Sequence, residues 1–365
     1  MALHYLDITG FRNLISVKLE PFSRGFNFIY GDNGSGKTSL LEAIYYLSLG
    51  RSFRSTVIDR VIHRSEDKLS LFAHIASNAG QTIPIGLERY AEGDLKLRIN
   101  GKDVYSIAEL ADHLPVQLID THCHHLLDAG PAFRRKYLDW GVFYLNKRFL
   151  ERWRQFGRAL KQRNAALRGQ ISKKELESWS HELIEHAIQL DIMRRQYVES
   201  LIPLLEKTIA ELLSLVNIRM TYYPGWDQSY DYAEILRHAI DKDSLLGYTQ
   251  FGPHRADLKV TIDRIPAKDI LSRGQQKLFV CAMILARGAL LQSGSNTRPI
   301  YLVDDLPSEL DVINRTNLLA LLSRQEAQIF ITAVERNCDN FLASTSVKMF
   351  HVEHGIVRDV FSNVE

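Results

Sequence analysis

The stretch Gly31-Asp32-Asn33-Gly34-Ser35-Gly36-Lys37-Thr38-Ser39 decides the fold class of this sequence. It follows a short apolar run, residues 25–30, and precedes Leu40, Leu41, Ala43, Ile44 and Leu47 at helical spacing. Residues 31–38 fit the pattern G-x-x-x-x-G-K-[ST] without a mismatch. A glycine-rich loop between a strand and a helix predicts the P-loop of an α/β protein.

The residue types of this loop suit a nucleotide phosphate chain. Gly34 and Gly36 let backbone N–H groups turn toward phosphate oxygens, and the helix N-terminus adds a positive dipole. Lys37 is predicted to reach the β- and γ-phosphates, and the Thr38 hydroxyl to bind Mg²⁺. The predicted cofactors are therefore ATP and Mg²⁺.

A magnesium site in such a fold needs a carboxylate at the end of a neighbouring strand. Residues 300–303 are an apolar run that ends in Asp304 and Asp305. We expect Asp304 to hold Mg²⁺, through water, and Asp305 to orient or deprotonate the attacking water. Asp304, Asp305 and Lys37 are thus the candidate catalytic residues.

A second candidate phosphate site is the sequence Leu-Ser-Arg-Gly-Gln-Gln-Lys at residues 271–277. Ser272 is a good N-cap for the apolar helix that follows, and Gly274 permits close backbone approach. One P-loop is enough to hold one ATP. A second phosphate-binding helix start therefore suggests a composite site, in which each of two chains completes the nucleotide site of its partner. The alternative reading is a simple capped helix.

The organisation of the 365-residue, 41.8 kDa chain predicts an α/β fold split in sequence. Strand patterns occupy both ends of the chain, whereas residues from about 130 to 214 are helix formers interrupted mainly at Pro203. We predict an ATPase head formed by residues 1–120 and 246–365, with an inserted α-helical domain at residues 121–245.

The formal charge is only +2, from 45 Lys+Arg against 43 Asp+Glu, so bulk charge does not indicate a nucleic-acid binder. Residues 134–168, however, carry eleven basic and two acidic residues, a local charge of +9. This local charge suits a phosphate backbone, although a solvated helix face is the alternative. We predict no base-specific contacts, and we expect Trp140, Trp153 and Phe156 to be core residues. The predicted DNA-binding residues are Arg148, Arg152, Arg154, Arg158 and Lys161, with Arg51 and Arg54 in a second patch.

Several features favour a cytoplasmic protein without a membrane partner. The N-terminus lacks a signal-peptide pattern, and the longest apolar stretch, residues 278–286, is too short to span a bilayer. The three cysteines, Cys123, Cys281 and Cys338, are widely spaced and odd in number, which favours a reducing compartment. Thr121-His122-Cys123-His124-His125 resembles a metal cluster, but neighbouring side chains on a strand or turn should diverge, and no second Cys/His pair follows at zinc spacing.

The three motifs in this order resemble an ABC-type ATPase of the SMC-like branch: Walker A, signature, then Walker B followed by the D-loop Ser308-Glu309-Leu310-Asp311. More narrowly, the chain resembles the bacterial RecF family from its N-terminus to about residue 353. The similar segments include residues 11–55, RRKYLDWG after Gly130-Pro131, KQRNAALR, and Phe251-Gly252-Pro253-His254.

The resemblance implies further site residues. Arg12 and Asn13 match a segment near the adenine. Gln117 matches the Q-loop position that senses Mg²⁺ and γ-phosphate, which makes Gln117 a further candidate catalytic residue and Mg²⁺ ligand. Thr332 lies where transporters carry a switch histidine. The implied nucleotide contacts are Gly31, Asn33, Gly34, Ser35, Gly36, Lys37, Thr38 and Ser39 in the P-loop, Ser272, Gly274 and Gln275 in the signature, and Asp311 in the D-loop.

The resemblance also implies a function. It points to a weak, DNA-stimulated ATPase of recombinational gap repair that forms an ATP-dependent homodimer on duplex or gapped DNA and assists RecO and RecR in loading recombinase. Two positions near the site depart from the family pattern. Asp305 replaces the glutamate usual in ABC proteins, which fits slow hydrolysis. Asp120-Thr121-His122 stands where many relatives have Pro-Glu. The alternatives are a motor subunit coupled to a membrane or other protein partner, and a P-loop kinase.

Overall fold

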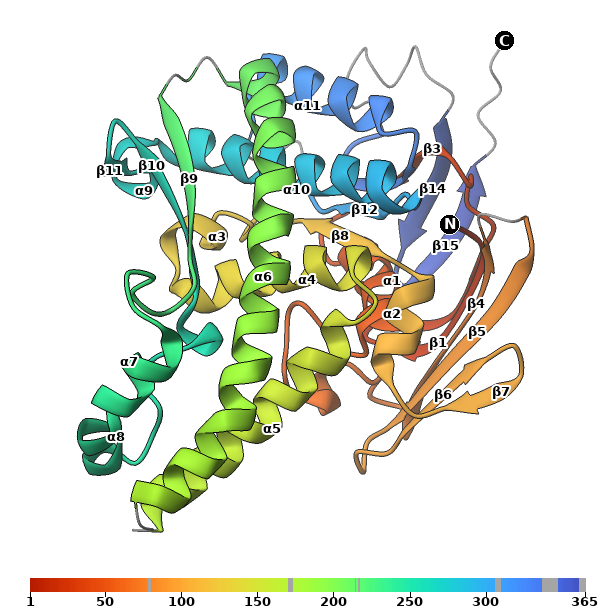
Figure 1. Cartoon of the computed structure of the whole chain (residues 1–365). Helices are drawn as coiled ribbons and strands as arrows, with labels where there is room; N and C mark the ends of the chain where they lie inside the picture. The colour runs from red at the N-terminus through yellow and green to blue at the C-terminus, as the bar shows by residue number, and fades with distance from the viewer. Residues whose placement is uncertain are drawn as a thin grey trace. The chain divides into compact units, whose positions relative to one another are not determined.

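The computed structural model describes residues 1–77, 80–169, 173–213, 215, 217–305, 310–336 and 347–360 (Figure 1). Contacts divide the chain into unit 1, which comprises residues 1–123, 211–213 and 277–365, and unit 2, which comprises residues 124–210 and 214–276. Unit 2 thus extends further toward the C-terminus than the predicted insert, and the functional domain boundaries stay a prediction. Ser308, Glu309 and Cys338 lie outside the described residues.

The described residues of unit 1 form two six-stranded sheets. One has the order β15-β14-β3-β13-β12-β8, with parallel pairing from β14 to β8 and an antiparallel β15 at its edge. The other has the order β2-β1-β4-β5-β6-β7 and is antiparallel. The strands of the first sheet are β3 (Gly25–Tyr30), β8 (Val116–Ile119), β12 (Ile300–Val303), β13 (Gln328–Ala333), β14 (Val347–Glu353) and β15 (Ile356–Val360). Those of the second are β1 (Ala2–Phe11), β2 (Leu14–Leu19), β4 (Lys68–Ala76), β5 (Thr82–Tyr90), β6 (Leu95–Ile99) and β7 (Lys102–Val104).

Helix α1 (Lys37–Leu49) packs against strands of both sheets. Its side chains Leu40, Leu41, Ile44 and Leu47 are fully buried in one apolar core that also contains residues of both sheets. Strands β12 and β13 are buried along their whole length, as expected of parallel strands covered on both faces. The strands predicted at both ends of the chain are therefore confirmed. The other helices that the structure describes within unit 1 are η1 (Ile58–Arg60), α2 (Ile107–His113) and α11 (Val312–Arg324).

Helix α10 (Arg273–Ser295) is longer than its predicted apolar stretch. By length and composition alone it could cross a membrane, yet 72% of its most apolar window is buried inside the structure. Residues 278–286 are all buried, and Phe279, Ala282 and Leu285 have no exposed surface. This burial is that of a core helix.

Unit 2, in its described residues, is mainly helical, with one three-stranded antiparallel sheet of order β11-β10-β9. The helix α6 (Lys173–Leu212) passes through Pro203 without ending, so the predicted interruption at that residue is wrong. Leu201 and Leu205 are buried on either side of Pro203, and this packing holds the helix although proline removes one backbone bond. The other elements are α3 (His125–Asp128), α4 (Pro131–Leu145), α5 (Phe149–Arg168), β9 (Ile218–Tyr223), α7 (Tyr232–His238), α8 (Ile240–Leu246), η2 (Pro253–Arg255), β10 (Asp257–Ile262), β11 (Ile265–Pro266) and α9 (Ala267–Ile270).

A fully buried ion pair joins α5 to α8. Arg163 Nη1 donates to Asp243 Oδ2 at 2.8 Å and to Thr249 Oγ1 at 2.6 Å, while its Nε donates to Ser180 Oγ at 3.1 Å. Neither Arg163 nor Asp243 has exposed side-chain surface. Arg163 therefore belongs to the interior of unit 2 and adds nothing to the basic surface counted from the sequence.

The aromatic residues of the basic segment differ in burial. Phe156 is buried, as predicted, but the Trp153 side chain is 47% exposed, so its prediction as a core residue is wrong. Helical spacing alone does not show whether a partner element covers that face of the helix. All four tryptophans of the chain, Trp140, Trp153, Trp179 and Trp226, lie in unit 2, so tryptophan fluorescence reports the folding of that unit.

His254 makes the stability of unit 2 depend on pH. Its Nε2–H donates to Thr249 O at 2.9 Å, and burial lowers the pKa of the ring to about 4. The unfolded chain takes up this proton near pH 6.5 and the folded protein only near pH 4. Neutral His254 therefore makes its full contribution to the free energy of unfolding above pH 6.5. This contribution is lost as the pH falls toward 4, and the total loss is about 3 kcal/mol.

Urea unfolding followed by tryptophan fluorescence from pH 7 to pH 4 measures this loss. The variant His254→Gln keeps an N–H donor for Thr249 O and does not titrate, so its free energy of unfolding should fall less over this range. His238→Gln, at an exposed position of the same unit, should behave like the parent protein. An unchanged pH dependence in His254→Gln would remove His254 from this role.

Candidate nucleotide-binding site

The glycine-rich loop connects β3 to α1, and its backbone is strained for any other residue at Gly31 and Gly36. Gly31 has φ 151°, and a Cβ there would lie 2.1 Å from Val352 O. Gly36 has φ 123°, and a Cβ there would lie 3.1 Å from the amide of Asn13. The first clash is with backbone and the second with a side chain that holds the loop, so both glycines fix its shape.

Asn13 clamps the loop from a neighbouring segment. Its Nδ2 donates to Ser35 O at 3.1 Å and to Gly34 O at 3.3 Å, and its Oδ1 accepts from Ser39 Oγ at 2.8 Å. Gly355, in the turn between β14 and β15, donates its N–H to Ser35 O at 2.8 Å. The hydrogen bond between Gly355 and Ser35 could not be predicted from local sequence, because more than three hundred residues separate the two partners.

The Lys37 side chain folds over the loop it follows. Its Nζ donates to Gly31 O at 2.7 Å and to Asp32 O at 2.8 Å. Burial lowers the pKa of this amine, while the nearby carboxylates of Asp305, Asp304 and Asp32 oppose the shift. The geometry gives a cation at the base of the loop, where the phosphates of a nucleotide bind in P-loop proteins.

Two oxygen atoms suited to Mg²⁺ meet at the end of β12. Thr38 Oγ1 donates to Asp304 Oδ1 at 3.0 Å. Adjacent ligands of an octahedral magnesium ion, at about 2.1 Å from the metal, lie about 3.0 Å apart, so the pair fits such an ion by direct contact as well as through the water that the sequence suggested. Burial raises the pKa of Asp304, against the hydrogen bonds from Thr332 and Thr38, and a bound cation would favour its charged form.

Thr332 joins the two acidic residues, a role that the sequence did not reveal. Its Oγ1 donates to Asp304 Oδ1 at 2.7 Å and accepts the N–H of Asp305 at 2.8 Å. Asp305 has φ 52°, a left-handed conformation that turns the chain directly after β12. Thr332, at the end of the neighbouring β13, thus fixes the position of Asp304 and the backbone of Asp305.

These groups surround a cavity of about 900 Å³, large enough for a nucleotide. Arg12 and Arg54 lie on its wall and both pair with the buried Glu42: Arg12 Nε and Nη2 at 3.0 and 2.6 Å, and Arg54 Nη1 at 3.6 Å. Arg54, predicted to bind DNA, therefore faces the cavity. The lining residues are Arg12, Asn13, Asn33, Gly34, Gly36, Lys37, Thr38, Ser39, Arg54, Asp59, Arg60, Ile62, His63, Arg64, Asp304, Asp305, Thr332 and Val334.

Gln117 does not line this cavity. It pairs in register with Tyr301 of β12, and its Oε1 accepts from Arg287 Nε and Nη2 at 3.0 and 2.9 Å in the interior. The residue that follows β8 is Asp120, whose pKa is raised by burial and by the nearby Asp304. The structure thus places Asp120, rather than Gln117, near the predicted magnesium ligand, at the position where the sequence already departs from the family.

The signature residues form the N-terminus of α10. Ser272 Oγ accepts from Gln275 N at 3.3 Å, and Gln275 Oε1 accepts from Ser272 N at 3.0 Å, a reciprocal capping box. Gly274 is exposed, and a Cβ there would meet nothing within 4 Å. Asp311 likewise caps α11 by accepting from Asn314 N at 2.9 Å, and this bond lowers its pKa. Among the described residues of the two motifs, Ser272, Gly274, Gln275 and Asp311 do not line the cavity.

The predicted DNA-binding residues of unit 2 lie on α5 and just before it. Arg154, Arg158 and Lys161 are exposed and spaced one turn apart, and we call these three residues the basic stripe. Arg148 is exposed, while Arg152 is half-buried beside Gln155, 3.2 Å away, and Glu185, 3.9 Å away. Arg51, in unit 1, is exposed and lies beside Tyr45.

Comparisons with known proteins agree with this geometry. The family described as RecF/RecN/SMC N terminal domain matches residues 2–358. The chain is 44% identical to the DNA replication and repair protein RecF of Shewanella frigidimarina over 98% of this chain and 99% of that protein. It is 43% identical to RecF of Pseudomonas aeruginosa, over 98% and 97% of the two chains.

Among solved structures, the chain is similar to a recombination mediator protein RecF of the RecFOR pathway with ATP, at a TM-score of 0.86 and 26% identity over 99% of this chain and 98% of that one. It also matches an SMC head bound to the C-winged helix domain of ScpA, at a TM-score of 0.60 and 16% identity over 99% and 98% of the chains. The second likeness concerns the fold alone. Together they identify a mixed α/β head of the ABC type with a helical insertion.

Proposed function

The chain belongs to the RecF family, and from this premise we propose that it is an ATP-controlled DNA-binding protein of recombinational gap repair. The single observation that carries the proposal is the meeting of Thr38 Oγ1 and Asp304 Oδ1 beside Lys37, in a cavity of nucleotide size. In the proposal ATP binds to residues 31–39 and to Asn13, with Mg²⁺ held by Thr38 and Asp304. Asp305 assists slow hydrolysis.

Two chains close around two nucleotides in this proposal. Ser272, Gly274 and Gln275 are exposed at a helix N-terminus, so they are available to the γ-phosphate bound by a second chain. Asp311, exposed at the start of α11, is the D-loop residue of the same interface. The test is sedimentation velocity: ATP with Mg²⁺ should convert the chain to a dimer, and a chain whose mass does not respond to nucleotide would contradict the proposal.

We propose that duplex and gapped DNA bind to the basic stripe and that hydrolysis opens the dimer and releases the DNA. Because solved relatives are described as mediators in the RecFOR pathway, we infer that RecO and RecR are the protein partners. Loading of recombinase takes place in the cytoplasm, which is the proposed compartment.

The variant Asp305→Asn tests the hydrolysis step. The amide keeps the size of the carboxylate and the backbone bond to Thr332, but it cannot take a proton from water. We expect ATP binding and dimerisation to persist while single-turnover hydrolysis falls about 100-fold or more. Asp112→Asn, on the exposed surface of α2, serves as the matched control and should hydrolyse ATP normally. Normal turnover in Asp305→Asn would exclude Asp305 from catalysis.

Removing the basic stripe tests the DNA surface. The triple variant Arg154→Ala, Arg158→Ala, Lys161→Ala should bind gapped duplex at least about tenfold more weakly, with a salt slope reduced by about 0.9 for each phosphate that is no longer neutralised. The control removes the same charge at the exposed positions Lys207, Arg237 and Lys242 of unit 2. Equal affinities of the two triple variants, measured by fluorescence anisotropy, would show that DNA lies elsewhere.

A further inference from the structure

His124, His125 and Asp128 form a cluster of potential metal ligands outside the nucleotide cavity. One ligand atom from each residue, an imidazole nitrogen or a carboxylate oxygen, lies within 4.8 Å of the other two. His124 Nε2 is 3.8 Å from Asp128 Oδ2. Within the described part of the chain, it is the one group of three or more His, Cys, Asp or Glu residues whose ligand atoms lie close enough together to share an ion.

The start of helix α3 explains why these side chains converge. The sequence suggested diverging side chains because neighbours on a strand or turn point different ways. His124 instead has helical backbone angles, φ −58° and ψ −21°, at the N-cap of α3. His124 and Asp128 are therefore one helical turn apart, and the rings of His124 and His125 approach to a centroid distance of 4.7 Å.

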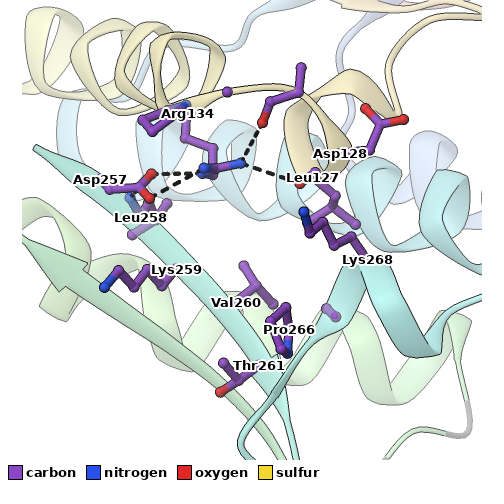
Figure 2. A pocket seen from close by; sticks show the side chains of 14 residues that line it. Leu127, Asp128, Arg134, Asp257, Leu258, Lys259, Val260, Thr261, Pro266 and Lys268 are labelled. Carbon is purple, nitrogen blue, oxygen red and sulfur yellow. Dashed lines mark hydrogen bonds and ion pairs between the residues drawn. The ribbon is translucent and has the colours of Figure 1, made fainter. Parts of the chain in front are cut away.

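Arg134 holds this helical turn in place (Figure 2). Its Nη1 donates to the carbonyl oxygens of Leu127 at 3.2 Å and of Ala129 at 2.9 Å, with a longer contact of 3.4 Å to Leu126. Its Nε and Nη2 bind the carboxylate of Asp257 at 2.7 and 3.2 Å. The backbone that carries the ligands is thus fixed before an ion binds, and Asp257 balances the charge of Arg134.

We propose that His124, His125 and Asp128 bind a divalent transition-metal ion of the zinc class. Two imidazole nitrogens and one carboxylate suit Zn²⁺ or Co²⁺, whereas Mg²⁺ prefers oxygen ligands alone. Ligands of a tetrahedral zinc ion lie about 3.3 Å apart, so shifts of about 1 Å in the side chains bring the three groups to bonding distance. Three protein ligands leave the fourth position to water.

Binding should also stabilise unit 2, because an ion held by its folded state shifts the unfolding equilibrium by mass action. The four tryptophans of that unit report this shift in a urea titration. The stabilisation does not depend on nucleotide, so it is measured without ATP and stands apart from the proposed function.

Titration of the full chain, purified without a histidine tag and freed of metal by dialysis against a chelator, tests the site. Co²⁺ is added in excess Mg²⁺, which occupies the oxygen sites, and is then displaced by Zn²⁺. We expect saturable binding with a visible absorption band, and a shift of unit 2 unfolding to higher urea with Zn²⁺. The variants His124→Ala and Asp128→Asn should each bind at least about tenfold more weakly.

The matched control is His122→Ala, at an exposed histidine just before the cluster, which should bind like the parent chain. The conservative variant His125→Gln provides a second measurement if His124→Ala folds poorly, since its amide keeps much of the ring's volume. Binding that is equal in the parent, His125→Gln and Asp128→Asn would overturn the proposal, as would the absence of any saturable Co²⁺ or Zn²⁺ binding.

Discussion

Replacing Lys37 by alanine is expected to weaken ATP binding about 100-fold and thereby to remove the nucleotide-dependent dimer. Lys37 Nζ sits on the carbonyl oxygens of Gly31 and Asp32, within reach of a phosphate chain in the loop. Charge-assisted hydrogen bonds to such a group contribute up to about 3 kcal/mol, so affinity for ATP should fall about 100-fold or more. Equilibrium binding of a fluorescent ATP analogue measures the loss, and sedimentation measures its effect on assembly.

The controls must exclude a general effect of losing a lysine and a loss of overall structure, because Lys37→Ala also removes two hydrogen bonds to loop carbonyls. Lys102→Ala, at an exposed position of β7, removes one lysine from the same unit and should bind ATP and dimerise like the parent chain. Far-ultraviolet circular dichroism should be equal for both variants. ATP-dependent dimerisation that persists in Lys37→Ala would contradict the assigned nucleotide site.

Arg163→Ala is expected to cause a large loss of stability in unit 2. The change leaves the buried carboxylate of Asp243 without its counter-charge, and Thr249 and Ser180 without their shared partner. Removal of one member of a buried ion pair costs about 3–5 kcal/mol. Urea unfolding followed by tryptophan fluorescence, which reports unit 2 alone, should show this loss.

Two further variants serve as controls for the effect of Arg163→Ala. Arg158→Ala, at an exposed position of the same helix, should change the free energy of unfolding by less than about 0.5 kcal/mol. The double variant Arg163→Met, Asp243→Leu removes both charges and should recover much of the lost stability. A loss below about 1 kcal/mol in Arg163→Ala would mean that water reaches this ion pair.

The nucleotide loop and the strand before Asp304 could be predicted because each is encoded by neighbouring residues. Glycines at fixed spacing, an apolar run and a helical repeat are local signals, and the buried parallel strands β3 and β12 followed from them. The capping box of Ser272 and Gln275 is equally local. The fold class needed only these segments and their order.

The features that the sequence did not reveal depend on distant partners. Thr332 meets Asp304 through the pairing of β12 with β13, and Gly355 meets Ser35 through the placement of β14 beside β3. Arg163 was counted as surface charge from the sequence because no residue near it in the chain indicates that it pairs with Asp243. Trp153 was assigned to the core by its helical spacing, and tertiary packing leaves it exposed. The Q-loop role of Gln117 stays a prediction, and in the structure its side chain contacts Arg287.

The central claim of the proposed function is that ATP controls the binding of DNA to a basic surface of the protein. Its most direct test is the affinity for gapped duplex across a range of salt concentrations, with and without ATP and Mg²⁺. We predict tighter binding with ATP, and a logarithm of affinity that falls with the logarithm of salt concentration with a slope steeper than about −2.7, the value for three phosphate contacts. A motor subunit or a kinase would give neither effect. Binding that is weak and insensitive to salt, or equal with and without ATP, would contradict this claim.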